Sequence, residues 1–235
     1  FGNLAAPALV HSVARGAELG FVVGGVNQQF LAARPGVAKL EEVQNGLLGA
    51  SRPGDLSEFL CRFLIDRELT GATVAYLGGT TDRVEALVAG RVDAIPLSPP
   101  AAIAALDSGC EWILDFGAYG LNFAIGGIAV TRGLLATDGH LVEIFLRAYL
   151  AGQARYKADR EFGIAVHQKY GEVERSVAER TYDVTRAGFR DLPDPATEGL
   201  SLLVEFLKSR GDIPSEVTME QVTDPTLIRR ICNTG

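Results

Sequence analysis

The feature that most constrains the fold is a regular alternation of short apolar runs and helix-like segments between residues 47 and 117. Residues 47–50 and 73–77 are short and apolar, which is typical of buried strands, and a glycine-containing loop follows each of them. The segments after these loops, residues 56–69 and 82–89, have the apolar spacing of amphipathic helices. Strands that alternate with helices predict an α/β fold built on a parallel sheet.

The same pattern continues on both sides of this region. Further strands are expected at residues 19–23, 92–97, 112–116 and 126–131, and further helices at residues 4–14, 98–106, 137–170, 174–186 and 197–210. Asp159 interrupts the longest of these segments and could divide it into two helices. The last hundred residues are therefore expected to be mainly helical.

Composition and charge argue against three classes of protein. No stretch approaches the roughly 18 uninterrupted apolar residues that a membrane-spanning helix needs. The net charge is −7 and the basic residues are scattered among acidic ones, which argues against a nucleic-acid-binding surface. Cys61, Cys110 and Cys232 are odd in number and lack CxxC spacing, so neither a disulfide framework nor a zinc site is indicated.

The chain contains a weak internal repeat. Residues 1–24 align with residues 94–117 at an offset of 93, with six identities that include Pro7 with Pro100 and Gly16 with Gly109. These prolines and glycines stand where a helix begins and where a turn follows it, so both copies predict a helix, a glycine and a strand. The second copy is preceded by a strand, loop and helix that have no counterpart before Phe1. The segment before the second copy, residues 47–93, is 47 residues long, so a similar number of residues is expected upstream of Phe1.

Several short motifs occur in a fixed order along almost the whole chain. They are Leu-Glu-Glu at residues 40–42, Gly-Ala-Ser-Arg-Pro-Gly at 49–54, Gly-Thr at 79–80, Ala-Leu-Val-Ala-Gly-Arg-Val-Asp-Ala at 86–94, Phe-Leu-Arg-Ala-Tyr-Leu-Ala-Gly at 145–152 and Val-Thr-Asp-Pro at 222–225. In this order they resemble the extracytoplasmic substrate-binding proteins of ABC importers, of the nitrate, taurine, alkanesulfonate and thiamine-precursor type.

The resemblance implies an α/β, two-lobed fold of the periplasmic-binding-protein type 2, with a ligand cleft between the lobes. Residues 1–46 and 118–235 would form one lobe, without its N-terminal part, and residues 47–117 the other. Such a protein is not an enzyme and needs no cofactor or metal. It captures a small organic solute, for example a sulfonate, a carboxylate or a pyrimidine-like compound, and delivers it to a membrane permease. It would be a periplasmic or otherwise extracytoplasmic monomer, either free or lipid-anchored.

The best candidate binding loop is residues 51–55, Ser-Arg-Pro-Gly-Asp, between a predicted strand and a predicted helix. Free backbone N–H groups and the helix dipole favour an anion at a helix start, which makes Ser51 and Gly54 candidate ligand contacts. Arg52 adds paired donors that suit a carboxylate or sulfonate. Asp55 stands where the similar proteins commonly have a hydroxyl residue. If Asp55 caps the helix, its carboxylate occupies the same donors, and the solute would be neutral or cationic.

Further candidate contacts lie at or after the carboxyl ends of predicted strands, where open α/β sheets bind ligands. Gly79 and Thr80 form a loop that could present N–H groups and a hydroxyl. Asn3 and Ser98 follow equivalent strands of the two repeats, and Asn122 follows the expected return of the chain to the first lobe. A turn or a helix cap explains most of these residues equally well.

The sequence offers little for catalysis. His11, His140 and His167 have no nucleophile and acid at a spacing that would bring the groups together, and neither HExxH nor GxSxG occurs. Two alternatives to a transport role remain. One is an enzyme on the same fold, similar to a desulfinase or a thiamine-pyrimidine synthase, which would use cysteine or histidine chemistry. The other is the ligand-sensing domain of a regulator.

Overall fold

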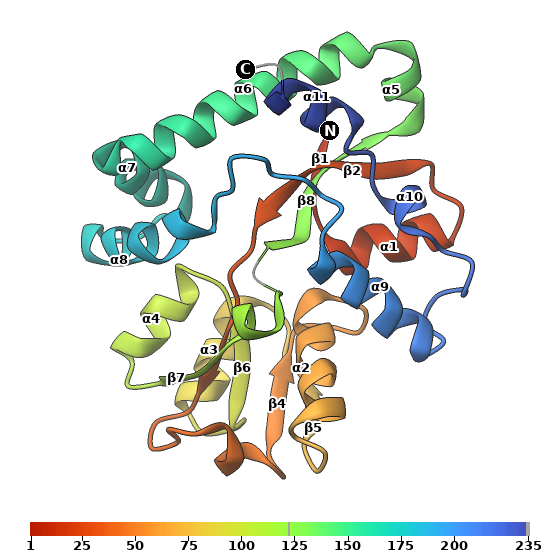
Figure 1. The fold of residues 1–235 in the computed structure, drawn as a ribbon. Coiled ribbons are helices and arrows are strands. Elements are labelled where there is room, and N and C mark those ends of the chain that lie inside the picture. Colours follow the sequence, from red (N-terminus) through yellow and green to blue (C-terminus); the bar gives the residue numbers. More distant parts are fainter. Residues whose placement is uncertain (122, 234–235) are drawn as a thin grey trace. The chain divides into compact units, whose positions relative to one another are not determined.

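The computed structural model describes residues 1–121 and 123–233, and these divide into two compact units (Figure 1). Unit 1 contains Phe1–Asn27, Tyr119–Val166 and Tyr182–Gly235, and unit 2 contains Gln28–Ala118 and His167–Thr181. Among the described residues, no helix is both long and apolar enough to cross a membrane.

Unit 2 is built on a five-stranded sheet in the order β5-β4-β6-β3-β7. The strands are β3 (Phe30–Ala33), β4 (Leu47–Ala50), β5 (Thr73–Tyr76), β6 (Ala94–Leu97) and β7 (Glu111–Asp115). The helices are α2 (Leu56–Arg67), α3 (Thr80–Val88) and α4 (Ala101–Asp107), with short 3-10 helices η1 (Leu40–Val43) and η2 (Phe116–Tyr119). The strand and helix order predicted for residues 47–117 is therefore confirmed.

The expectation of a parallel sheet is only partly correct. Strand β4 pairs in parallel with β5 and β6, but β3 runs antiparallel to both β6 and β7. All four residues of β3 are buried, so the strand shows no polar alternation, and its partners lie about 60 or more residues away in the chain. Residues 28–46, which contain β3, belong to unit 2, and residues 167–181 belong to it as well. The division thus differs from the expected lobes of residues 1–46 with 118–235 and residues 47–117.

Unit 1 is built on a three-stranded antiparallel sheet in the order β1-β8-β2. The strands are β1 (Gly2–Ala5), β2 (Leu19–Val26) and β8 (Phe123–Thr131). The helices are α1 (Ala6–Ala14), α5 (Arg132–Thr137), α6 (Gly139–Ala158), α9 (Glu198–Ser209), α10 (Met219–Val222) and α11 (Thr226–Asn233), with the 3-10 helix η3 (Arg186–Gly188). Residues of both units contribute to α7 (Arg160–Gly171) and α8 (Arg175–Thr185).

The buried core of unit 1 joins this sheet to two helices. Its members come from β2, β8, α6 and α11, and they are Val22, Val23, Val130, Val142, Leu146, Ile228 and Ile231. The predicted break at Asp159 is confirmed, because α6 ends at Ala158 and α7 begins at Arg160. The Asp159 carboxylate accepts a hydrogen bond from Phe162 N at 3.0 Å, which satisfies a free N–H group in the first turn of α7.

Both copies of the repeat, which are offset by 93 residues, fold as strand, helix and strand, namely β1-α1-β2 and β6-α4-β7. The equivalent glycines that follow the two helices have left-handed backbones, with φ of 91° at Gly16 and 83° at Gly109. In each sheet the two repeat strands flank an antiparallel strand, β8 in unit 1 and β3 in unit 2. The sequence repeat therefore marks a repeated topology.

Candidate functional site

The loops after β4, β5 and β6 gather at one edge of the unit 2 sheet. Ala50 lies opposite Tyr76 in the parallel pair of β4 and β5, and Gly78 N donates to Ser51 O at 3.1 Å. Ser98 follows β6, the parallel neighbour of β4 on the other side. The structure thus brings together seven predicted contact residues, namely Ser51, Arg52, Gly54, Asp55, Gly79, Thr80 and Ser98. Of the other two, Asn3 belongs to unit 1 and Asn122 lies outside the described residues.

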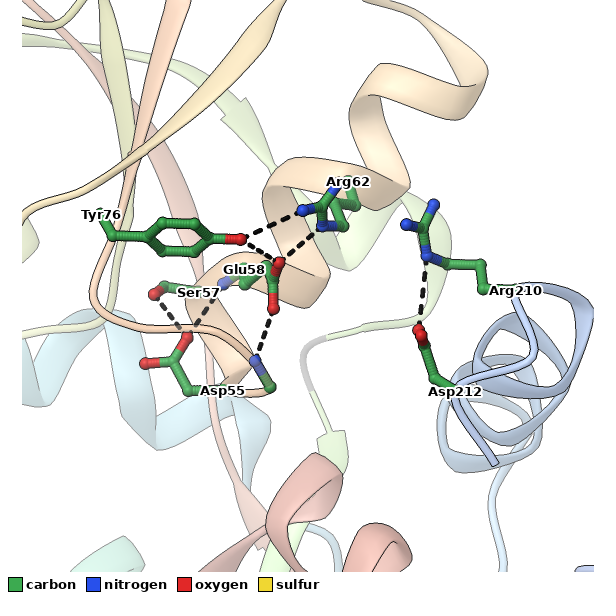
Figure 2. Close-up of polar contacts among 8 residues, drawn as sticks. Asp55, Ser57, Glu58, Arg62, Tyr76, Arg210 and Asp212 are labelled. Atoms are coloured by element: carbon green, nitrogen blue, oxygen red, sulfur yellow. Dashed lines mark hydrogen bonds and ion pairs between the residues drawn. The ribbon is translucent and has the colours of Figure 1, made fainter. Parts of the chain in front are cut away.

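Asp55 caps helix α2. Its Oδ1 accepts hydrogen bonds from Glu58 N at 3.0 Å and Ser57 Oγ at 2.8 Å (Figure 2). Its Oδ2 accepts a hydrogen bond from Ser51 Oγ. The backbone N–H group of Ser51 also has a partner, because it donates a hydrogen bond to Ser57 Oγ at 2.8 Å. The loop therefore satisfies its own donors, whereas Arg52 stays exposed to solvent. With Asp55 capping the helix, the expected solute is neutral or cationic.

Glu58 ties this loop to strand β5, a role that the sequence analysis did not predict. One carboxylate oxygen accepts from Arg62 Nε at 2.6 Å and from the Tyr76 hydroxyl, and the other accepts from Gly54 N at 2.5 Å (Figure 2). Burial opposes ionisation of Glu58, but the hydrogen bonds from Tyr76, Gly54 and Arg62 outweigh it and hold the pKa of Glu58 below its usual value. The pKa of Tyr76 is raised, mainly because its hydroxyl donates to that carboxylate. Only the i,i+4 spacing of Glu58 and Arg62 signals this cluster in the sequence.

The lowered pKa of Glu58 predicts a loss of stability in acid. We expect Glu58→Gln to lower the free energy of unfolding by about 1 kcal/mol at pH 7. The folded-state pKa lies below the unfolded one, so the ionised carboxylate adds stability above the unfolded pKa, and that stability disappears as the pH falls through the folded pKa. Denaturant unfolding of both proteins at pH 7 and in acid should show the difference shrinking, with the exposed Glu85→Gln as control. A difference of the same size at both pH values would contradict the prediction.

Gly79 and Thr80 begin helix α3 and also have partners within unit 2. Gly79 N donates to Asp82 Oδ2 at 3.0 Å, and Thr80 Oγ1 accepts from Arg83 Nη2 at 3.3 Å. Gly78 before them has φ of 85°, a left-handed backbone that favours glycine. As at the start of α2, a carboxylate of the protein accepts a hydrogen bond from a backbone N–H group at the start of α3.

Arg83 is a buried cation beneath this edge, and the sequence gives no sign of its burial. It is only 7% exposed, and its Nη1 donates to Pro96 O of β6 at 2.7 Å. Burial lowers the pKa of Arg83, while the Asp55 carboxylate opposes that shift. The guanidinium links α3 to β6 through its hydrogen bond to Pro96 O.

In unit 1, Asn3 lies inside β1, whereas the sequence suggested that it follows a strand. It lines a cavity of about 240 Å³ together with residues at the carboxyl end of β2. The lining consists of residues 3–5, 25–27, 126 and 127, and none of these side chains is ionisable. Glycine is required here, because a Cβ on Gly127 would lie 2.3 Å from Val23 O and one on Gly126 would lie 2.9 Å from Leu4 O. Asn27, which also lines the cavity, is a candidate contact that the sequence analysis missed.

Burial disfavours the thiolate form of all three cysteines. Burial is the main cause that raises the pKa of Cys61, Cys110 and Cys232. Cys61 is fully buried, with its Sγ 3.9 Å from Gly49 O. Over residues 1–121 and 123–233, no group of three or more His, Cys, Asp and Glu side chains could hold a metal ion.

The two repeat-containing α/β units define the class of fold, which is the periplasmic-binding-protein type 2 fold. The structure is similar to the periplasmic aliphatic sulphonate binding protein SsuA from Escherichia coli, with a TM-score of 0.77 and 17% identity over 96% of this chain and 75% of that one. It is also similar to the ligand binding component of an ABC-type import system from Staphylococcus aureus, with a TM-score of 0.78 and 12% identity over 97% and 79% of the chains. The resemblance expected from the sequence motifs is confirmed at the level of the fold.

An enzyme shares this fold. The desulfurization enzyme DSZB matches with a TM-score of 0.73 and 14% identity over 99% of this chain and 84% of that one. No protein-family model and no curated protein sequence matches the chain. Because binding proteins and an enzyme both occur on the fold, the fold by itself does not decide between binding and catalysis.

Proposed function

We propose that this chain is the substrate-binding component of an ABC importer, which captures a small organic solute and delivers it to a membrane permease. The observation that carries the proposal is the match of nearly the whole chain to two solute-binding components, at TM-scores of 0.77 and 0.78. Polar loops at the carboxyl ends of strands support it, because open α/β sheets bind ligands there. In this role the protein works outside the cytoplasm as a monomer.

Binding without chemistry is favoured over the enzyme alternative by the state of the thiols. Another solved structure of similar fold is a cysteine-to-serine mutant of DSZB in complex with biphenyl-2-sulfinic acid. In the present chain Cys61 is buried in α2 rather than placed on a polar loop, and the pKa of every cysteine is raised. A thiol must ionise to act as a nucleophile, so these cysteines are poorly suited to such a role.

A solute screen tests the proposal. Small organic solutes that raise the melting temperature of the protein would be titrated by calorimetry and recovered afterwards for mass spectrometry. We expect one-to-one binding and an unchanged solute, with about 2.7 kcal/mol of added stability at a solute concentration of about 100 times Kd. Biphenyl-2-sulfinic acid would serve as the probe for the enzyme alternative. Its conversion by the wild-type protein would overturn the assignment as a non-catalytic binding protein.

A further inference from the structure

Unit 1 contains another cavity, which shares no lining residue with the one at Asn3. One wall is a face of α6, and the opposite wall is formed by η3, the loop that follows it and α11. The volume of about 480 Å³ falls in the usual range of about 300–1,000 Å³ for a small-molecule site. Every lining residue belongs to unit 1, so this unit forms the cavity by itself.

The α6 wall of the cavity is mainly apolar. Leu150, Ala154 and Ala158 are spaced four residues apart, which places them on one face of the helix. Leu150 and Cys232 also pack against the buried core of unit 1, so this side of the cavity is firmly supported. The two alanines leave room above the helix, where the hydrocarbon part of a ligand would be covered.

The other side of the cavity carries an excess of positive charge. Its ionisable side chains apart from Cys232 are Lys157, Arg186 and Asp191, which sum to +1, whereas the whole chain carries −7. Arg186 Nε donates to Lys157 O at 2.9 Å, which fixes the guanidinium. Among residues 1–121 and 123–233 its two Nη groups have no hydrogen-bond partner. Such a pair of parallel donors matches the two oxygens of a carboxylate.

The remaining cation has a partner that a ligand can replace. Lys157 Nζ lies 2.5 Å from Asp191 Oδ1, but the Asp191 side chain is 96% exposed. An ion pair with so exposed a carboxylate adds little stability, so exchanging it for a ligand carboxylate costs little. The backbone of the loop is held separately, because Gln153 Nε2 donates to Arg190 O at 2.6 Å and Cys232 Sγ lies 3.6 Å from Asp191 O. The Asp191 side chain can therefore turn away while the wall stays in place.

We propose that this cavity is a separate binding site for a small organic anion, a monocarboxylate with a short aliphatic chain or an aromatic ring. The carboxylate pairs with Arg186 and Lys157, and the apolar part lies over the α6 wall. The site goes beyond the proposed solute-binding function, because it uses none of the residues of the candidate loops or of the Asn3 cavity.

Cys232 provides a reporter inside the cavity. Cys61 and Cys110 are buried and Cys232 is partly exposed, so iodoacetamide should alkylate Cys232 first. The alkylation rate, assigned to each cysteine by peptide mass spectrometry, would be followed against the concentration of hexanoate or benzoate. At about ten times Kd roughly a tenth of the sites are free, so we expect alkylation to slow about tenfold. Hexanamide and benzamide lack the charge and should bind at least about tenfold more weakly.

Substitution of the cations locates the carboxylate. Arg186→Gln removes the charged pair of donors, so we expect it to weaken hexanoate or benzoate binding about tenfold. Arg15→Gln is the matched control, because Arg15 is an exposed arginine of unit 1 that does not line the cavity. Lys157→Gln removes the other cation and serves as the test if circular dichroism shows that Arg186→Gln does not fold.

Three results would overturn this binding site. They are no protection of Cys232 by either carboxylate, equal protection by a carboxylate and its amide, and unchanged protection in the folded cation variant. The solute-binding function would remain standing in each case, because the solute screen measures it independently.

Discussion

Gly127→Ala should lower the free energy of unfolding by about 3 kcal/mol, because the added methyl group has no room. A Cβ at this position would lie 2.3 Å from Val23 O and 3.2 Å from Gly24 Cα, and both atoms belong to the backbone of β2. The neighbouring strand cannot rotate away as a flexible side chain would, so the β2–β8 pairing must shift. Denaturant unfolding followed by circular dichroism measures the loss.

Gly152→Ala is the matched control for this glycine. It lies inside helix α6, where nothing stands within 4 Å of an added Cβ, so alanine should stabilise the protein by about 0.5–1 kcal/mol. Equal stabilities of wild type and Gly127→Ala would show that β8 can move at low cost.

Leu146→Ala should cost about 3 kcal/mol of unfolding free energy, since it removes a fully buried side chain that joins α6 to the unit 1 sheet. Leu141→Ala on the same helix makes the same chemical change at a residue that is 44% exposed, and it should change stability by less than about 1 kcal/mol. Parallel denaturation of the two variants gives the comparison. Similar losses for both would mean that α6 is not packed on the sheet through Leu146.

The candidate binding loop shows how far local sequence can be interpreted. The order of strand, loop and helix around Asp55 follows from apolar spacing and from the residues that begin a helix. The sequence leaves open whether the helix start binds a ligand or is capped by Asp55. The structure shows the cap, because the Asp55 carboxylate accepts a hydrogen bond from the backbone N–H of Glu58. The hydroxyls of Ser51 and Ser57 donate to the same carboxylate.

Other parts of the site depend on residues that are distant in the chain. Arg83 looks like an exposed residue of an amphipathic helix, and only the packing of α3 against β6 brings its guanidinium to Pro96 O. Asn27 is a candidate ligand contact only because it lines one cavity together with residues of β1, β2 and β8. Neither the periodicity of apolar residues nor any short motif predicts contacts between residues so far apart in the chain.

The sequence by itself determined the alternating elements, the break at Asp159 and the repeat with Gly16 and Gly109 after its helices. These features depend on interactions within a few residues, which composition and spacing record directly. Only the tertiary structure decided that β3 runs antiparallel between β6 and β7, and that residues 28–46 belong to unit 2. Strand pairing joins backbone groups that are far apart in the chain, and every residue carries similar backbone donors and acceptors, so the local sequence does not specify the partner.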